Sequence, residues 1–416
     1  MRVASLFSGI GGLEIGLHKA GHRTELLCEI MPAAKAVLSD RFPQTELTDD
    51  VSKLRDLPRA IDIITAGFPC QDLSQAGLTK GLDGARSGLV GEVFRLAERS
   101  RAPWLVIENV PFMLQLNGGD AMRRIVDTLE ELKYRWAWRV VDTNGFGLPQ
   151  RRERVFLIAS RIADPADVLL ADDNPFGRPT TAIGRLAHGF YWTEGRGGLG
   201  WAVDAIPTLK NGSAVGIPSP PAILMPDGSI IKPNIRDAER LQGFDEDWTM
   251  PAERVARASL RWTLLGNAVS VPVAAWVGGR LAEPGHYYSL RDGPFPAHGK
   301  LPKAARFDGK KRYSVDISAD PVGARFPHLA DFLRYAGEPL SARATAGFLS
   351  RTREAALRFA PGFIEAVELH LERMGGVAPP PPSKPRKASR VEVSQATDEL
   401  FVMVEVAGTR RRRAVA

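Results

Sequence analysis

The feature that most constrains the fold of this chain is an alternation of strand-like and helix-like segments through residues 1–160. Short apolar runs such as Val3–Phe7 and Ile61–Ala66 are separated by segments with helical patterning, such as Pro32–Arg41, which begins at a proline. This alternation predicts an α/β fold with a parallel sheet. The other expected strands are Leu26–Ile30, Trp104–Ile107 and Arg154–Ala159, and the other expected helices are Leu89–Arg99 and Met122–Leu132. Ligands bind such sheets at the carboxyl ends of the strands, so we expect the functional residues there.

The regular alternation stops after residue 160, which indicates a second lobe. Gly, Pro and Trp become frequent over residues 161–235, and we expect this segment to form a small, irregular, β-rich lobe. Helical patterns resume over 236–283, including Pro272–Leu281, and we assign this segment to the first domain.

The C-terminal part is expected to add two further regions. Residues 285–376 are interpreted as a helical extension, because Ser341–Met374 has the pattern of two helices separated at Pro361-Gly362. Residues 377–416 form a Pro-rich basic linker and tail, which we expect to be disordered in part.

Charge and cysteine content narrow the function classes. The formal net charge of +7 permits an anionic partner such as nucleic acid, although part of the excess lies in Arg410–Arg413. Two cysteines, Cys28 and Cys70, exclude a disulfide framework and a cysteine-rich zinc site, and no metal is expected. The absence of a long apolar run and of a signal-peptide pattern predicts a cytoplasmic protein without a membrane anchor.

A glycine turn follows the first expected strand, in the segment Phe7–Gly12. Such a turn allows a ligand to approach the backbone closely. It does not match the dinucleotide fingerprint, because Glu14 stands where that fingerprint has its third glycine. Glu29 ends the second strand, where an acid can hold ribose hydroxyls, and Asp50 is placed to accept from an adenine amino group.

Cys70 lies in a loop, Gly67–Ser74, directly after an apolar strand. A free cysteine is commonly a small buried hydrophobic residue, and this interpretation suits Cys28, which falls inside a strand. The loop neighbours of Cys70 favour a nucleophile instead.

Two charged segments complete the candidate site. Glu108-Asn109-Val110 ends another strand, and Glu108 is a candidate partner for Cys70 across one cleft. In the run Gln150–Arg154, Arg152 and Arg154 are two residues apart, so on a strand they point to the same side. Taken alone, Glu108–Val110 is compatible with an ordinary loop start, and a solvated charge run is the favoured interpretation of Gln150–Arg154.

Taken together and in this order, the segments resemble the motifs of the cytosine carbon-5 DNA methyltransferase family. The matching segments are Phe7–Gly12, Gly67–Gln71 with Ser74, Glu108–Val110, Gln150–Arg154, Arg240–Phe244 and Gly266–Val269. The resemblance covers residues 1–283. It departs from the family in two respects: the expected recognition lobe, 161–235, is short, and residues 285–416 follow the last motif.

The resemblance implies a Rossmann-like S-adenosylmethionine-dependent core that methylates carbon 5 of a cytosine flipped out of double-stranded DNA. It implies that Cys70 adds to carbon 6, that Glu108 contacts the ring N3 and the amine, that Arg154 contacts the base carbonyl, and that Arg152 helps hold the base and the Cys70 loop. The implied cofactor-binding residues are Phe7, Gly9, Gly11, Gly12, Glu29, Asp50, Pro69, Leu89, Asn267 and Val269. The implied DNA-binding residues are Ser74, Arg86, Ser87, Gln150 and Thr208.

Three alternatives stay open on the sequence. A tRNA cytosine-5 methyltransferase has the same core, although the aromatic stretch 190–201 favours DNA. A catalytically inactive DNA-binding protein is disfavoured by the presence of Cys70, Glu108, Arg152 and Arg154, and a nicotinamide oxidoreductase by Glu14. We expect a monomer, with a cognate restriction endonuclease as a further partner that the sequence does not identify.

Overall fold

The computed structural model describes residues 1–69, 88–175, 177, 183–195, 198–212, 220–355, 357 and 359–379. The chain divides into two compact units. Unit 1 comprises Met1–Gly177 and Ile235–Pro327, and unit 2 comprises Arg178–Asn234 and His328–Ala416. No helix in the described ranges is both long and apolar enough to cross a membrane.

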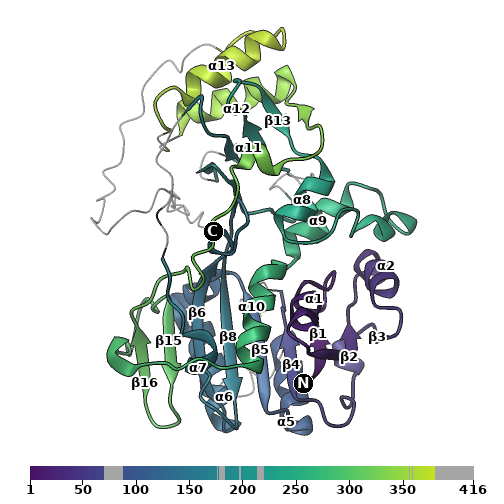
Figure 1. Ribbon diagram of the computed structural model, residues 1–416, viewed down its shortest axis with the longest axis vertical. Helices are drawn as coiled ribbons and strands as arrows, with labels where there is room; N and C mark the ends of the chain where they lie inside the picture. The colour runs from purple at the N-terminus through teal and green to yellow at the C-terminus, as the bar shows by residue number, and fades with distance from the viewer. Residues whose placement is uncertain are drawn as a thin grey trace, which may run out of the picture. The chain divides into compact units, whose positions relative to one another are not determined.

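Unit 1 is built around a ten-stranded sheet in the order β14-β16-β15-β6-β8-β5-β4-β1-β2-β3 (Figure 1). The strands are β1 (Arg2–Leu6), β2 (Arg23–Cys28), β3 (Glu46–Thr48), β4 (Ile63–Ala66), β5 (Trp104–Asn109), β6 (Arg135–Asp142), β8 (Glu153–Ser160), β14 (Asp292–Pro294), β15 (Ala304–Phe307) and β16 (Arg312–Val315). Strands β1 to β5 pair in parallel, as the alternation predicts. From β5 onward each pairing is antiparallel, so the sheet is mixed and the expectation of a parallel sheet is correct only for its first half.

Helices cover both faces of this sheet: α5 (Leu89–Ser100) and α6 (Asp120–Glu131) pack on one face, and α1 (Gly12–Lys19), α7 (Ala166–Leu169) and α10 (Val271–Ala282) pack on the other. Unit 1 also contains α2 (Pro32–Arg41), α8 (Ile235–Leu241) and α9 (Leu260–Asn267). Short 3₁₀ turns lie at Val51–Lys53 (η1), Pro111–Leu114 (η2), Leu116–Gly119 (η3), Thr143–Gly145 (η4), Met250–Arg254 (η5) and Ser289–Arg291 (η6), and Gln150–Arg151 forms the short strand β7. Helix α2 has the bounds that the sequence predicts, because Pro32 at its first turn marks its start.

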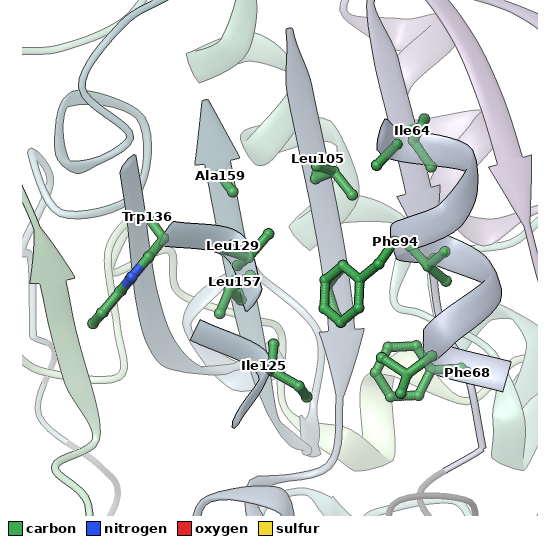
Figure 2. Packing of buried hydrophobic residues seen from close by; sticks show 14 of the residues in the cluster. Ile64, Phe68, Phe94, Leu105, Ile125, Leu129, Trp136, Leu157 and Ala159 are labelled. Atoms are coloured by element: carbon green, nitrogen blue, oxygen red, sulfur yellow. The ribbon is translucent and has the colours of Figure 1, made fainter. Parts of the chain in front are cut away.

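Apolar side chains from α5 and α6 fill one face of the sheet. Phe94 of α5 packs with Ile64 and Leu105, while Ile125 and Leu129 of α6 lie near Leu157 and Trp136 (Figure 2). On the other face α1 packs against α10, where Gly16 comes so close that an added Cβ would overlap the Cβ of Ala274. These contacts fix the carboxyl ends of β1, β4 and β5, where the expected site residues lie.

Residues 285–327 differ from the helical extension that we expected. They form β14, β15 and β16, which extend the sheet of unit 1 beyond β6. Each strand has only three or four residues, too few to show a period of two in the sequence. Their burial depends on a distant partner, because Phe307 stacks on Trp136 of β6.

Unit 2 contains a five-stranded sheet in the order β10-β9-β12-β13-β17. Its elements are β9 (His188–Phe190), β10 (Trp201–Val203), β11 (Ile206–Pro207), β12 (Ala222–Leu224), β13 (Ile230–Lys232), α11 (Leu329–Phe332), β17 (Glu338–Pro339), α12 (Ala342–Glu354) and α13 (Phe363–Arg373). The two helices expected within Ser341–Met374 are confirmed, and Gly362, with a φ of 85°, precedes the second of them. Segment 328–379 thus joins 178–234 in one unit, instead of forming an extension of its own.

Candidate active site

The glycine turn lies between β1 and α1, as the sequence predicts. Phe7 has a φ of 58°, which is unusual for a residue with a side chain, and its ring meets Phe68 edge to face at 6.4 Å. A Cβ on Gly12 would lie 2.5 Å from the carbonyl oxygen of Val269, whereas no described atom lies within 4 Å of a Cβ built on Gly9. The turn is therefore closed on the side of Val269 and approachable at Gly9.

Glu29 fastens this turn to the start of α2. Its carboxylate accepts hydrogen bonds from the backbone N–H groups of Gly9 and Met31, both at 2.8 Å. Burial raises the pKa of Glu29, and the two N–H donors oppose that shift. Glu29 is thus held in one orientation at the end of β2, next to the glycine turn.

The other expected cofactor residues have varied surroundings. Asp50 caps η1 by accepting from the N–H and hydroxyl of Ser52, and these hydrogen bonds lower its pKa. Pro69 and Asn267 are exposed, Leu89 is half-buried at the first turn of α5, and Val269 is buried. All of them belong to unit 1.

Glu108 and Arg154 form an ion pair at the end of β5. The Glu108 Oε1 lies 3.1 Å from the Arg154 Nε, and both side chains are largely buried. Burial raises the pKa of Glu108, although the positive charges of Arg154 and Arg152 oppose the shift. The site therefore holds a carboxyl group that takes up a proton more readily than an exposed glutamate does.

Asn109 connects β5 to the loop after β4. Its Nδ2 donates to the carbonyl of Phe68 at 2.9 Å, and its Oδ1 accepts from the N–H of Val110. Gly67 adjoins Glu108, because an added Cβ would lie 3.5 Å from the Glu108 Oε2. These contacts position the segment Gly67–Pro69 that leads into Cys70. Cys70 itself, Ser74, Arg86 and Ser87 lie outside the described residues.

Arg152 lies between β7 and β8, just before the strand that we expected to begin at Arg154. Its guanidinium group donates to the carbonyl oxygens of Gly266 and Ala268 at 3.1 and 2.5 Å. Its backbone N–H donates to Asp142. Arg152 therefore fixes the C-terminal end of α9, which carries Asn267. Its sequence pattern did not predict this contact.

Gln150 has a different setting from the DNA contact that we expected. It has no exposed surface, and its Nε2 donates to the carbonyl of Leu241 at 2.8 Å. The neighbouring Gln242 accepts from Ser270, which in turn bonds Thr143. A side chain buried in this network cannot reach a phosphate or a base, so we correct the prediction: Gln150 holds β7 to the end of α8.

Cys28 is a core residue, as its place within a strand predicts. It is 2% exposed in β2, and burial raises the pKa of its thiol to about 12. Since the thiolate is the nucleophilic form, Cys28 is unsuited to nucleophilic attack.

Comparisons with known proteins identify the family of this chain. The C-5 cytosine-specific DNA methylase family matches residues 1–183. The type II methyltransferase M2.BsuMI of Bacillus subtilis (strain 168) is 47% identical over 381 residues, which cover 88% of this chain and 97% of the relative.

The chain belongs to the C-5 cytosine-specific DNA methylase family.

Other relatives are more distant. The type II methyltransferase M1.ScrFI of Lactococcus lactis subsp. cremoris is 27% identical over 314 residues, covering 68% of this chain and 78% of the relative. Among solved structures, S. pombe Dnmt2 methyltransferase has a TM-score of 0.47 and 16% identity, and the match covers 68% of this chain and 98% of that one.

This protein is accordingly a DNA cytosine-5 methyltransferase, and S-adenosylmethionine is the methyl donor that its family implies. The expected reaction class is confirmed, and an inactive DNA-binding protein and a nicotinamide oxidoreductase are set aside.

Sequence reasoning missed one residue that supports the glycine turn of this methyltransferase. Trp248 donates from its indole N–H to the carbonyl of Ile10 at 2.8 Å, and its ring packs against Phe42 and Phe244. Trp248 lies more than 230 residues from the turn along the chain, and its only local signal is its position just after the Arg240–Phe244 motif.

Proposed function

We propose that this methyltransferase modifies a cytosine flipped out of double-stranded DNA through a covalent adduct between the Cys70 sulfur and carbon 6 of the ring. The observation that supports this proposal is the Glu108–Arg154 pair, which adjoins the segment Gly67–Pro69 that precedes Cys70. An acid of raised pKa and a cation are the groups that activate a pyrimidine toward nucleophilic addition.

The residues around the glycine turn fit S-adenosylmethionine. Gly9 leaves room for close approach to the backbone, and the fixed Glu29 carboxylate retains acceptor capacity suited to ribose hydroxyls. We assign the nucleoside to Phe7, Glu29 and Asp50, and the remaining contacts to Gly9, Gly11, Gly12, Pro69, Leu89, Asn267 and Val269. When bound, the cofactor supplies an electrophilic methyl group on a sulfonium sulfur.

In the proposed reaction, the thiolate of Cys70 forms a bond to carbon 6 while Glu108 donates a proton to N3. The electron pair of the carbon 5–carbon 6 double bond becomes available at carbon 5, which would bond the methyl carbon as the methyl carbon–sulfur bond breaks and leaves its electron pair on the sulfur. A base then removes the proton from carbon 5, the double bond reforms, and the Cys70 thiolate leaves. Glu108 gives up a proton in the first stage and regains it when N3 is deprotonated.

Two arginines have separate proposed parts. Arg154 contacts the base carbonyl and keeps Glu108 oriented through its ion pair. Arg152 is a positioning residue, because its described contacts hold the C-terminal end of α9 at Gly266 and Ala268. Contacts with DNA are assigned to Ser74, Arg86, Ser87 and Thr208, and unit 2 is the proposed site of sequence readout in the major groove.

The test combines a variant and a trapping substrate. Cys70→Ala should abolish methyl transfer and leave S-adenosylmethionine affinity within about twofold. A duplex with 5-fluorocytosine at the target should leave a covalent adduct on Cys70, because fluorine does not leave as a proton does. Cys28→Ala is the matched control: it should methylate normally and lose about 1–2 kcal/mol of stability. Methylation by Cys70→Ala, or an adduct on another residue, would contradict the assignment.

We further propose that the modification protects DNA against a cognate restriction endonuclease, as the type II name of its relative suggests. Methylation-sensitive sequencing of DNA from cells that express the protein would identify the target sequence. That sequence, placed in a plasmid, should then resist an endonuclease of the same specificity. A dispersed pattern without a preferred sequence would argue against a protective role.

A further inference from the structure

The segment that follows unit 1 completes the sheet of unit 2. Strand β17 pairs antiparallel with β13, so that Pro339 faces Ile231 and Glu338 faces Lys232. The backbone N–H of Leu340 also donates to the carbonyl of Ile230 at 2.9 Å. The C-terminal segment 328–379 therefore supplies the edge strand next to β13.

The same segment supplies much of the core of unit 2. Phe348 of α12 and Phe363 of α13 are fully buried, and their ring centroids lie 4.6 and 5.3 Å from that of Phe190 in β9. Phe363 also contacts Trp201 of β10 at 5.7 Å. Strands β9, β10 and β12 have three residues each, and packing against a helix is one way in which such small sheets become stable.

His370 of α13 joins the two segments through its ring. Its Nδ1 accepts from the N–H of Ile230 at 3.1 Å, and its Nε2 is 2.9 Å from the carbonyl of Leu340, to which it donates. One ring nitrogen accepts while the other donates, so this geometry requires the neutral imidazole. The ring is buried, and both bonds are protected from water.

A second set of contacts between the two segments involves Asp204, His328 and Leu329. The Asp204 carboxylate accepts from the N–H of Leu329 at 2.9 Å and pairs with the Nδ1 of His328 at 2.7 Å. Asp204 precedes the loop that contains Thr208, and the carbonyl of Thr208 accepts from the hydroxyl of Tyr191 at 2.8 Å. The start of the C-terminal segment thus holds the turn before β11 (Ile206–Pro207), the strand that leads directly into Thr208.

We propose that the target-recognition lobe of this enzyme is built from two distant segments, 178–234 and 328–379, and that the second segment is required for target choice. This proposal rests on the proposed role of unit 2 in sequence readout. The second segment acts by positioning: its strand, its aromatic rings and His370 hold the loop of Thr208 in a fixed conformation. The sequence by itself would suggest exchanging residues 161–235 alone with the segment of a relative. Such an exchange would replace Phe190 and its neighbours but keep Phe348 and Phe363, which pack against them.

The experiment uses the full chain, with substitutions of buried and of exposed residues in α12 and α13. Phe348→Ala and His370→Ala remove the contacts, whereas Arg343→Ala and Glu365→Ala change exposed residues of the same helices. His370→Asn is the conservative variant, since its side-chain oxygen can accept from Ile230. Each variant is assayed by hydrogen exchange of β9 to β13 and of β1 to β5, by calorimetry with S-adenosylmethionine, and by methylation-sensitive sequencing.

Phe348→Ala and His370→Ala should raise amide exchange in β9 to β13 by about tenfold or more, and leave β1 to β5 and cofactor affinity unchanged. The ratio of methylation at the preferred sequence to that elsewhere should fall by about tenfold or more. Arg343→Ala and Glu365→Ala should show the amide exchange and target preference of the unmodified protein. For His370→Asn, both quantities should lie between those of the unmodified protein and those of His370→Ala.

Two outcomes would overturn the proposal. Unchanged protection and unchanged target choice in both core variants would show that 328–379 is dispensable. Equal loss of protection in β1 to β5, with loss of cofactor binding, would show a general loss of folding. If the unmodified protein methylates no duplex cytosine, the proposed function fails, while the exchange data still decide whether the two segments form one lobe.

Discussion

The Oε1 of Glu108 and the Nε of Arg154 lie 3.1 Å apart, in a largely buried pair at the end of β5. Because burial raises the pKa of Glu108, the pair combines an acid that can donate a proton with a cation that keeps it oriented.

Glu108→Gln should lower kcat by about 10²–10⁴-fold with little change in cofactor affinity, because an amide cannot deliver a proton to N3. A donor is protonated below its pKa, so the rate of the unmodified enzyme should fall as pH rises through the raised pKa of Glu108. The variant should lack that alkaline limb. Single-turnover rates over a pH series measure both effects, and the exposed Glu98→Gln is the control. A pH profile shared by Glu108→Gln and the unmodified enzyme would contradict this role.

Glu29→Ala should weaken S-adenosylmethionine binding by roughly 1–3 kcal/mol, because it removes the ribose acceptor and frees the N–H groups of Gly9 and Met31. Glu46→Ala, which changes an exposed residue of β3, should bind normally. Titration calorimetry decides the question, and unchanged affinity in Glu29→Ala would move the cofactor away from the end of β2.

Glu14 should make stability depend on pH. It is fully buried in α1, and burial raises its pKa from 4.5 to about 7. Neither carboxylate oxygen meets a hydrogen-bond donor at normal geometry within the described residues, although the nearby Ser5 hydroxyl lowers the pKa in part. Between pH 4.5 and about pH 7 the folded chain holds a proton that the unfolded chain has released. The free energy of unfolding should therefore fall by about 3 kcal/mol in all as the pH rises through this range.

Glu14→Gln should remove that dependence and be the more stable protein above about pH 7. Urea unfolding midpoints of both proteins at about pH 5 and about pH 8 measure the difference. Glu98→Gln should show the pH dependence of the unmodified chain. Parallel pH dependence in Glu14→Gln would mean that this carboxyl group does not titrate as its burial implies.

The tail beyond Pro379 should add salt-sensitive attraction to DNA. It contains eight basic and four acidic residues, and half of the basic ones are Arg410–Arg413. Deleting 380–416 spares the carbonyl of Pro379, which accepts from Arg353, and should leave turnover at low salt nearly unchanged. It should flatten the plot of log affinity against log salt by about 0.9 for each DNA phosphate that the tail neutralises.

A full-length variant with Ser at 410–413 separates charge from length. It should reproduce part of the flattening, since it removes half of the basic residues. Binding curves over a salt series for the three proteins test this, and identical slopes would leave the tail without a role in DNA binding.

The local pattern of residues determined much of unit 1. Strands β1, β2, β4, β5 and β8 and helices α2, α5, α6 and α10 lie at or near their expected ranges, because the strands are short apolar runs and the helices carry apolar residues at helical spacing. The placement of Glu29, Glu108 and the glycine turn at strand ends also follows from the sequence, since parallel strands end at one edge of the sheet.

Only the tertiary structure decided what depends on contacts between distant segments. Gln150 resembled a surface residue until Leu241 and Gln242 were seen to bury it, and Trp248 gave no local sign that it would bond Ile10. Strands β14 to β17 are too short to carry a period, and each becomes a strand only where a neighbour supplies hydrogen bonds. The packing of 328–379 against 178–234 likewise depends on distant contacts. The apolar residues of each segment can be recognised in the sequence. Which segment they pack against cannot, because burial is a property of the pair and not of either segment.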